Sequence, residues 1–86
     1  MVYYVYFIKT LDTYRGKTYV GYTNNLYKRL EKHNSSLGAK STKGYKWQII
    51  YKKKFYLKSK ALSFEYKLKK DRKERLRLLY EFKKKS

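Results

Sequence analysis

Charge constrains the fold of this chain more than any other feature, because 24 lysines and arginines are accompanied by only six aspartates and glutamates. The formal net charge is +18 within 86 residues, so the basic side chains repel one another in any compact state. A polyanionic partner relieves that repulsion, and nucleic acid is the commonest one. A hydrophobic share of 42% and an aromatic share of 20% indicate a folded chain rather than a disordered basic tail.

Length and residue usage exclude several classes of protein. We expect one domain spanning residues 1–86, because a chain this short can bury only one modest core. The absence of cysteine excludes disulfides and thiolate metal sites, and the single histidine, His33, makes a zinc site improbable. No apolar run approaches the roughly 20 residues that span a bilayer, and residues 1–9 lack the form of a signal peptide. We therefore expect an intracellular protein of a bacterium or a virus-infected cell, neither secreted nor membrane-bound.

Alternation predicts three strands. Residues 3–8 form a β-branched and aromatic run that places Tyr4, Tyr6 and Ile8 on one face and Tyr3, Val5 and Phe7 on the other. A polar loop at 10–17 leads to a second strand at 18–22, where Gly21 indicates a close approach to the backbone. The third strand covers 46–55, and its alternation puts Trp47, Ile49 and Tyr51 on one face.

Helical spacing predicts three helices between and after these strands. The first runs from about Asn24 to Asn34 behind a Thr23 cap, and the second runs from a Ser59 cap to about Lys70. A basic C-terminal segment at about 71–86 comprises a third helix, amphipathic through Leu76, Leu79 and Tyr80, and a basic tail from Lys83. The order β-β-α-β-α-α predicts an α+β fold, in which helices flank a small three-stranded antiparallel sheet.

Charged residues on apolar helix faces are the main candidates for chemistry. Glu65 lies four residues after Ala61 and three before Leu68, inside the apolar stripe of its helix. A carboxylate on an inward face must be paired, protonated or metal-bound. Arg29 and His33 lie one turn apart on the inward stripe of the first helix.

Each of these residues also has a purely structural interpretation. Glu65 can form a salt bridge to a lysine, Arg29 can extend its stem along the edge of the core, and His33 can be a satisfied buried histidine. The tyrosines of the first two strands can simply cover a sheet. Three loop lysines are typical of a solvated face that attracts phosphate: Lys40, Lys43 and Lys46.

The ordered set of these residues resembles the GIY-YIG endonuclease family. The segments Tyr4-Val5-Tyr6 and Tyr19-Val20-Gly21 are similar to the two halves of its signature. The family's order continues through Tyr22-Thr23, Arg29-Leu30, His33-Asn34, Gly38-Ala39-Lys40, Thr42, Trp47 and Glu65. The resemblance covers about 3–70, is strongest to small standalone members, and extends more distantly to the UvrC N-terminal nuclease domain. The chain departs from the family at Tyr4, which replaces a glycine, and has no asparagine beyond Glu65.

The resemblance implies hydrolysis of DNA with one divalent ion, Mg²⁺ or Mn²⁺. It implies that Glu65 is the metal ligand, that Arg29 steadies the scissile phosphate, and that His33 supports the tyrosine or the phosphate. Tyr6 and Tyr19 are implied to lie beside the attacking water, and either can be its base. We expect the partner to be duplex, branched or damaged DNA, cut with low sequence preference in repair or recombination.

Two other functions remain open from the sequence. A catalytically weak or inactive module could use the +18 charge to bind nucleic acid without cutting it. A membrane-surface role for the basic last helix ranks lowest.

Overall fold

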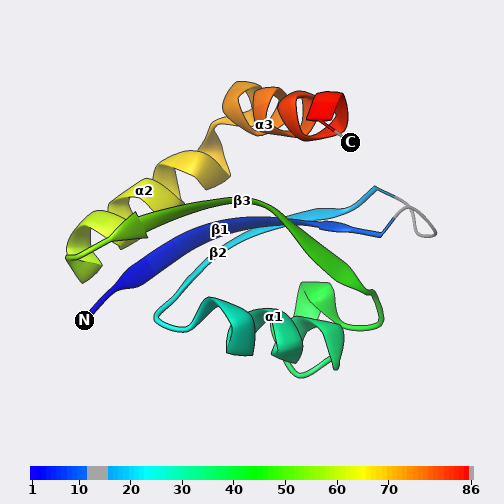
Figure 1. The fold of residues 1–86 in the computed structure, drawn as a ribbon, viewed down its shortest axis with the longest axis horizontal. Helices are drawn as coiled ribbons and strands as arrows, with labels where there is room; N and C mark the ends of the chain where they lie inside the picture. The colour runs from blue at the N-terminus through cyan, green and yellow to red at the C-terminus, as the bar shows by residue number, and fades with distance from the viewer. Residues whose placement is uncertain (12–15, 86) are drawn as a thin grey trace.

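The computed structural model describes residues 1–11 and 16–85, and it shows a three-stranded sheet with helices on both faces (Figure 1). The elements are β1 (Tyr3–Thr10), β2 (Thr18–Thr23), α1 (Leu26–Asn34), a 3₁₀ turn η1 (Lys40–Thr42), β3 (Trp47–Phe55), α2 (Lys58–Lys70) and α3 (Arg72–Lys85). The expected α+β order of strands and helices is confirmed.

The sheet is antiparallel with the strand order β2-β1-β3, so β1 is the central strand. In this register Tyr6 lies opposite Gly21 of β2. The hairpin between β1 and β2 begins with a 3.0 Å hydrogen bond from the Thr10 amide to the Lys17 carbonyl. The expected loop at 10–17 includes residues 12–15, which lie outside the described part of the chain.

The two faces of β1 support two separate cores, as the alternation predicts. Val5 and Phe7 pack with Ala61 and Leu68 of α2, and Leu78 of α3 joins the same cluster. On the opposite face Tyr6 and Ile8 pack with Leu26 of α1 and with Trp47. Figure 1 shows this division, with α2 and α3 above the sheet and α1 below it.

The predicted alternation of β3 is wrong at Tyr51. The β1–β3 register shifts between Phe7, which faces Tyr51, and Ile8, which faces Ile49. A bulge at that point places two successive residues, Ile50 and Tyr51, in the core of α2 and α3, while Ile49 stays on the α1 face.

Both predicted helix caps are displaced in the structure. The side chain of Asn25, not Thr23, accepts from the Lys28 amide at 3.1 Å and caps α1. Thr23 instead accepts from the Asn25 amide, which fixes the turn before the helix. Leu57 is the N-cap residue of α2, so Ser59 lies inside its first turn.

The predicted inward face of the third helix is correct at Leu79, which packs against the core of Leu78, and wrong at Leu76 and Tyr80. Leu78 is buried, whereas Leu76 and Tyr80 are 51% and 65% exposed. The basic tail expected from Lys83 is part of α3, which continues to Lys85. None of the helices described for residues 1–11 and 16–85 is long and apolar enough to cross a membrane.

Candidate active site at the edge of the sheet

Tyr6 of β1 extends across Gly21 of the edge strand β2 and meets α1. Its hydroxyl lies 2.8 Å from Nε2 of His33 and accepts a 3.3 Å hydrogen bond from Nε of Arg29. A β-carbon at position 21 would lie 2.4 Å from the Tyr6 hydroxyl, which explains the glycine in this strand. The close approach expected at Gly21 is therefore that of Tyr6 itself.

The hydrogen bonds around His33 define its tautomer. The Thr42 hydroxyl donates to the Ala39 carbonyl at 2.8 Å, so its oxygen is left to accept from Nδ1 of His33, also at 2.8 Å. With the proton on Nδ1, the Nε2 atom is an acceptor, and the Tyr6 hydroxyl must donate to it. His33 is thus fixed on both sides and completely buried.

The loop that carries Thr42 is anchored to the end of α1 and the start of β3. The Asn34 side chain accepts from the Trp47 amide at 2.5 Å and donates to the Trp47 carbonyl at 3.2 Å. The Trp47 indole N–H donates to the Thr42 carbonyl at 3.0 Å. These bonds hold the 3₁₀ turn against His33.

Burial controls the protonation of the Tyr6–His33 pair. Burial raises the pKa of Tyr6 to about 12, although the hydrogen bond and charge of Arg29 oppose the shift. Burial, followed by the charge of Arg29, lowers the pKa of His33 to about 4. Near neutral pH both side chains are therefore uncharged, and Arg29 supplies the positive charge beside them.

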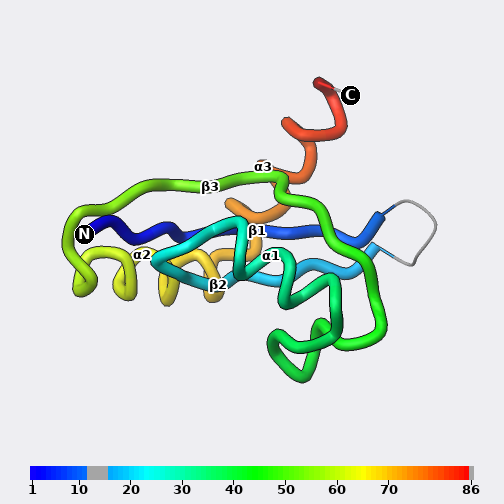
Figure 2. Tube along the Cα trace, turned by 60° about the horizontal axis from the view of Figure 1, so that its bottom comes forward, coloured from blue at the N-terminus to red at the C-terminus, as the bar shows by residue number. Residues whose placement is uncertain are grey.

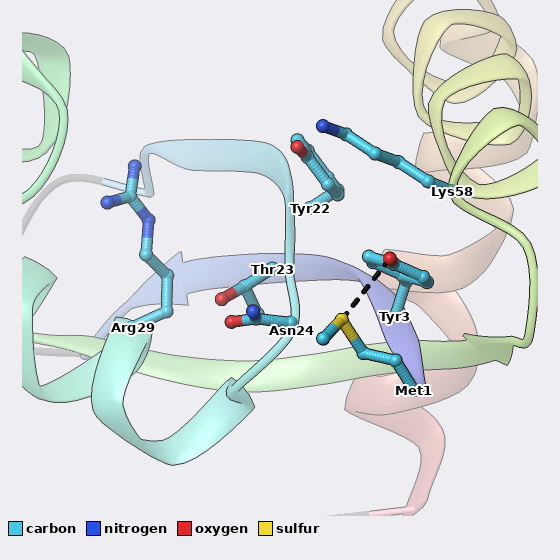
Figure 3. A pocket seen from close by; sticks show the side chains of 7 residues that line it. All are labelled: Met1, Tyr3, Tyr22, Thr23, Asn24, Arg29 and Lys58. Atoms are coloured by element: carbon cyan, nitrogen blue, oxygen red, sulfur yellow. Dashed lines mark hydrogen bonds between the residues drawn. The ribbon is translucent and has the colours of Figure 1, made fainter.

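Arg29 is half-buried on α1 and faces both signature tyrosines. Its hydrogen bond to Tyr6 is the main cause of its raised pKa, and Tyr19 contributes through charge and a hydrogen bond. The guanidinium also lines an open cleft at the C-terminal end of β2 (Figure 3). Arg29 can therefore reach an incoming anion while its Nε stays bonded to Tyr6.

Tyr19 completes the aromatic part of the site from β2. Its ring centroid lies 6.4 Å from that of Tyr6 and 5.2 Å from that of His33. Tyr19 is only partly buried, whereas Tyr6 is 2% exposed. Of the two tyrosines, Tyr19 is the one that water can reach.

Glu65 approaches the site from α2, on the opposite face of the sheet. Its side chain is 16% exposed and forms a 3.4 Å ion pair with Lys69, one turn along the helix. Its charge also acts on Tyr6, so the carboxylate lies within electrostatic reach of the tyrosine. The expected pairing with a lysine is confirmed, and the pair is solvent-accessible because Lys69 is 49% exposed.

The three loop lysines lie on the segment that contains the 3₁₀ turn and leads to β3. Lys40 and Lys43 are exposed on and after the 3₁₀ turn. Lys46 is exposed too, but its ammonium donates to the Asn34 carbonyl at 2.7 Å and so neutralises the C-terminal end of α1. Their role in binding nucleic acid stays a prediction.

The described side chains at this site offer a divalent cation one carboxylate, that of Glu65. Within residues 1–11 and 16–85, no three side chains of His, Cys, Asp or Glu group closely enough to hold a metal. Mg²⁺ nevertheless needs only one or two carboxylates when substrate phosphates and water complete its shell. Glu65 can supply that single carboxylate.

Three small residues support the site through contacts that the residue pattern does not reveal: Thr42, Gly21 and Gly38. A β-carbon at Gly38 would lie 2.5 Å from Nδ1 of His33, just as one at Gly21 would meet Tyr6. Thr42 and Gly38 belong to the ordered resemblance, but their roles become visible only through His33. The structure thus brings Tyr6, Tyr19, Arg29 and His33 into one cluster, with Glu65 at its margin.

The chain is thus a small α+β domain whose antiparallel three-stranded sheet carries a Tyr–His–Arg cluster at its edge. The family model described as "GIY-YIG catalytic domain" matches residues 2–78, and this chain belongs to that family. A UPF0213 protein of Oceanobacillus iheyensis is 42% identical over 78 residues, covering 88% of this chain and 87% of that protein. A UPF0213 protein of Staphylococcus saprophyticus is 40% identical over 80 residues, covering 91% and 94%.

A solved structure supports the same assignment. The solution NMR structure of the UPF0213 protein BH0048 from Bacillus halodurans is 33% identical, with a TM-score of 0.55. The match covers 93% of this chain and 84% of that one. Family membership indicates nuclease activity in general, with nucleic acid as the substrate.

Proposed function

We propose that this chain is a metal-dependent endonuclease that hydrolyses DNA phosphodiester bonds with low sequence specificity. The observation that carries the proposal is the position of Arg29, which is bonded to buried Tyr6 and also lines an open cleft. A guanidinium used only to attract DNA would need no such support, because exposed lysines do the same.

Arg29 is the group that contacts the scissile phosphate. Its Nε is bonded to Tyr6 and the guanidinium also bonds to Tyr19, so the N–H groups of its terminal nitrogens that face the cleft donate to phosphate oxygens. Tyr6 and His33 act as positioning residues, because their hydrogen bonds fix the guanidinium before substrate binds.

Tyr19 receives the proton of the attacking water. It is the more exposed tyrosine of the pair, and its ring lies beside the Tyr6–His33 cluster. As the water oxygen bonds to phosphorus, the Tyr19 hydroxyl accepts the water proton and passes its own proton to solvent. The bond from phosphorus to the leaving oxygen breaks, and that oxygen takes a proton from solvent.

Glu65 would hold the divalent ion, Mg²⁺ or Mn²⁺. Such an ion neutralises the charge that develops on the phosphate and leaving oxygens. In the ion's absence the carboxylate is paired with Lys69, which keeps its charge compensated.

The test is an assay of the full chain on duplex, single-stranded, flapped and four-way DNA, with Mg²⁺, Mn²⁺ or chelator. Glu65→Gln keeps the shape of the side chain but removes its charge, so we expect loss of cutting with binding retained. Glu31→Gln is the matched control, because Glu31 is exposed on α1. Cutting by Glu65→Gln at the normal rate would defeat the metal-ligand role.

The second candidate is a nucleic-acid-binding module that does not cut. The Glu65–Lys69 pair favours it, since a lysine already satisfies the carboxylate. Its signature is steep salt dependence of binding, with a log–log slope of about −0.9 per neutralised phosphate, and no cutting on any substrate with either metal.

A further inference from the structure

A cleft beside the proposed active site combines aromatic rings with positive charge. It has a volume of about 500 Å³ and is lined by Met1, Tyr3, Tyr22, Thr23, Asn24, Arg29 and Lys58. Two of these residues are tyrosines, two are cations and none is acidic. The volume falls within the range of about 300–1,000 Å³ that is usual for small-molecule sites.

The fold assembles this cleft from three separate segments. Figures 1 and 2 both show the N-terminal end of β1 beside the start of α2. Tyr3 comes from β1, Tyr22 from β2 and Lys58 from the first turn of α2. Both tyrosines pack against the core shared with α2, and the Tyr3 hydroxyl donates to the Met1 sulfur at 3.3 Å. Their rings are therefore held in place at the wall of the cleft.

Arg29 and Lys58 lie at opposite ends of the cleft. Figure 3 shows the guanidinium on one side, the tyrosines on the other, and the Lys58 amino group next to Tyr22. Arg29 also belongs to the Tyr6–His33 cluster. A ligand in the cleft would thus extend directly from the position where the scissile phosphate is proposed to bind.

We propose that this cleft is a subsite for one unpaired nucleotide of the substrate strand, adjacent to the scissile phosphate. The nucleotide's base packs on Tyr22 and Tyr3, and its phosphate contacts Lys58. Every base has a π-face that can stack on an aromatic ring, and stacked bases beside a cationic groove are the usual mode of single-strand binding. A base within a duplex is covered by its neighbours and cannot lie on these rings without leaving the stack. The inference rests on the proposed function, whose substrate class it narrows to DNA with unpaired nucleotides at the cut.

The test uses the full chain in chelator, so that no cutting occurs, with flapped DNA whose junction fixes the register and whose single-stranded flap carries 2-aminopurine at successive positions. Stacking on tyrosine should quench the fluorescence at one position and leave distant positions bright. Tyr22→Phe should keep the quenching, whereas Tyr22→Leu should lose it and weaken binding at least about 5-fold. Tyr80→Leu is the control, because Tyr80 is exposed on α3.

A second variant guards against a folding defect in Tyr22→Leu, since Tyr22 packs on the core. Lys58 is exposed, so Lys58→Gln should leave the circular dichroism spectrum unchanged and weaken binding of the same strand several-fold.

Quenching that is equal at all positions, or unaffected by Tyr22→Leu, would overturn the subsite. Free dAMP that binds as tightly as the strand would also overturn it, since the site would then serve a free nucleotide. If quenching is position-specific but the chain does not cut DNA with Mg²⁺ or Mn²⁺, the subsite stands and the proposed nuclease function fails. If the chain cuts DNA but the quenching is absent, the nuclease function stands and the subsite fails.

Discussion

The Tyr6 hydroxyl on β1 donates a 2.8 Å hydrogen bond to Nε2 of His33 on α1, and its oxygen accepts from Arg29 at 3.3 Å. One phenol thereby links a neutral base and a permanent cation, both from one helix. Because the phenol is buried, this link is a property of the folded chain that can be measured without substrate.

The first prediction is that Tyr6→Phe destabilises the protein by about 1–3 kcal/mol, because it leaves the buried Nε2 of His33 without a donor. Urea unfolding measures the loss. Tyr80→Phe removes an exposed hydroxyl and should change stability by less than about 0.5 kcal/mol. Equal stability of the two variants would mean that the buried bond contributes nothing.

The second prediction concerns pH. Burial first, and the charge of Arg29 second, lower the pKa of His33 from 6.5 to about 4. Between these values the unfolded chain binds a proton at this site and the folded chain does not, so stability rises with pH across the window. The contribution is fully present above pH 6.5 and is lost as pH falls toward 4, on the order of 2–3 kcal/mol in total.

The measurement is the free energy of unfolding from pH 4 to 8 for the native chain and for His33→Gln. Subtracting one curve from the other removes the contribution of the carboxylates, which titrate in both proteins. A difference curve that is flat between pH 4 and 6.5 would show that His33 takes up its proton equally in both states.

The third prediction tests the steric role of Gly21. Gly21→Ala places a β-carbon 2.4 Å from the Tyr6 hydroxyl and 2.6 Å from Cζ, so the ring must move away from His33 and Arg29. We expect a stability loss of about 1–3 kcal/mol and reduced turnover. In Gly16→Ala the new methyl meets nothing within 4 Å, which makes it the matched control. Normal turnover in Gly21→Ala would show that the position of Tyr6 is unimportant.

Periodicity alone predicts most of this fold, because the two faces of β1 and the inward stripes of α1 and α2 follow from spacing. Arg29 and His33 lie on the stripe of Leu26, and the structure places them against Tyr6. Alternation fails at Tyr51 because a bulge depends on how two strands pair, which a single strand's pattern does not encode.

Contacts between distant segments are the part that sequence patterns could not predict. Thr42 acts only through His33, and the anchoring of its turn depends on Asn34 and Trp47. The cleft of Tyr3, Tyr22 and Lys58 combines three elements whose proximity follows from the packing of α2 on the sheet. In α3, spacing is compatible with several faces, and the burial of Leu78 is settled by the adjoining core.

The fourth prediction separates a catalytic arginine from a merely attractive one. Arg29→Lys keeps the positive charge but loses the planar guanidinium. An ammonium cannot donate to Tyr6 and to the proposed phosphate in one fixed geometry. We expect single-turnover cleavage to fall about 10²–10³-fold, with a much smaller change in DNA dissociation. Arg72→Lys, at an exposed position of α3, should alter neither quantity. Small, equal effects of the two substitutions would favour the binding module.

The last prediction concerns competition for Glu65. Its carboxylate is paired with the Lys69 ammonium at 3.4 Å, and a divalent ion held by the same carboxylate must displace that ammonium. A half-exposed pair of this kind contributes about 0.2–1 kcal/mol, so Lys69→Gln should tighten metal binding in the absence of DNA by up to about 5-fold. Titration with Mn²⁺, followed by the paramagnetic signal of the free ion, measures this affinity directly.

Lys70→Gln is the control for the general effect of lowering net charge. It removes a neighbouring charge, and the Lys70 amino group lies over the Tyr66 ring. If both substitutions tighten binding equally, overall charge governs the affinity and the Glu65–Lys69 pair has no specific role. If Lys69→Gln alone tightens it, a DNA phosphate that attracts Lys69 away from Glu65 would also promote metal binding, and the site would assemble fully only on its substrate.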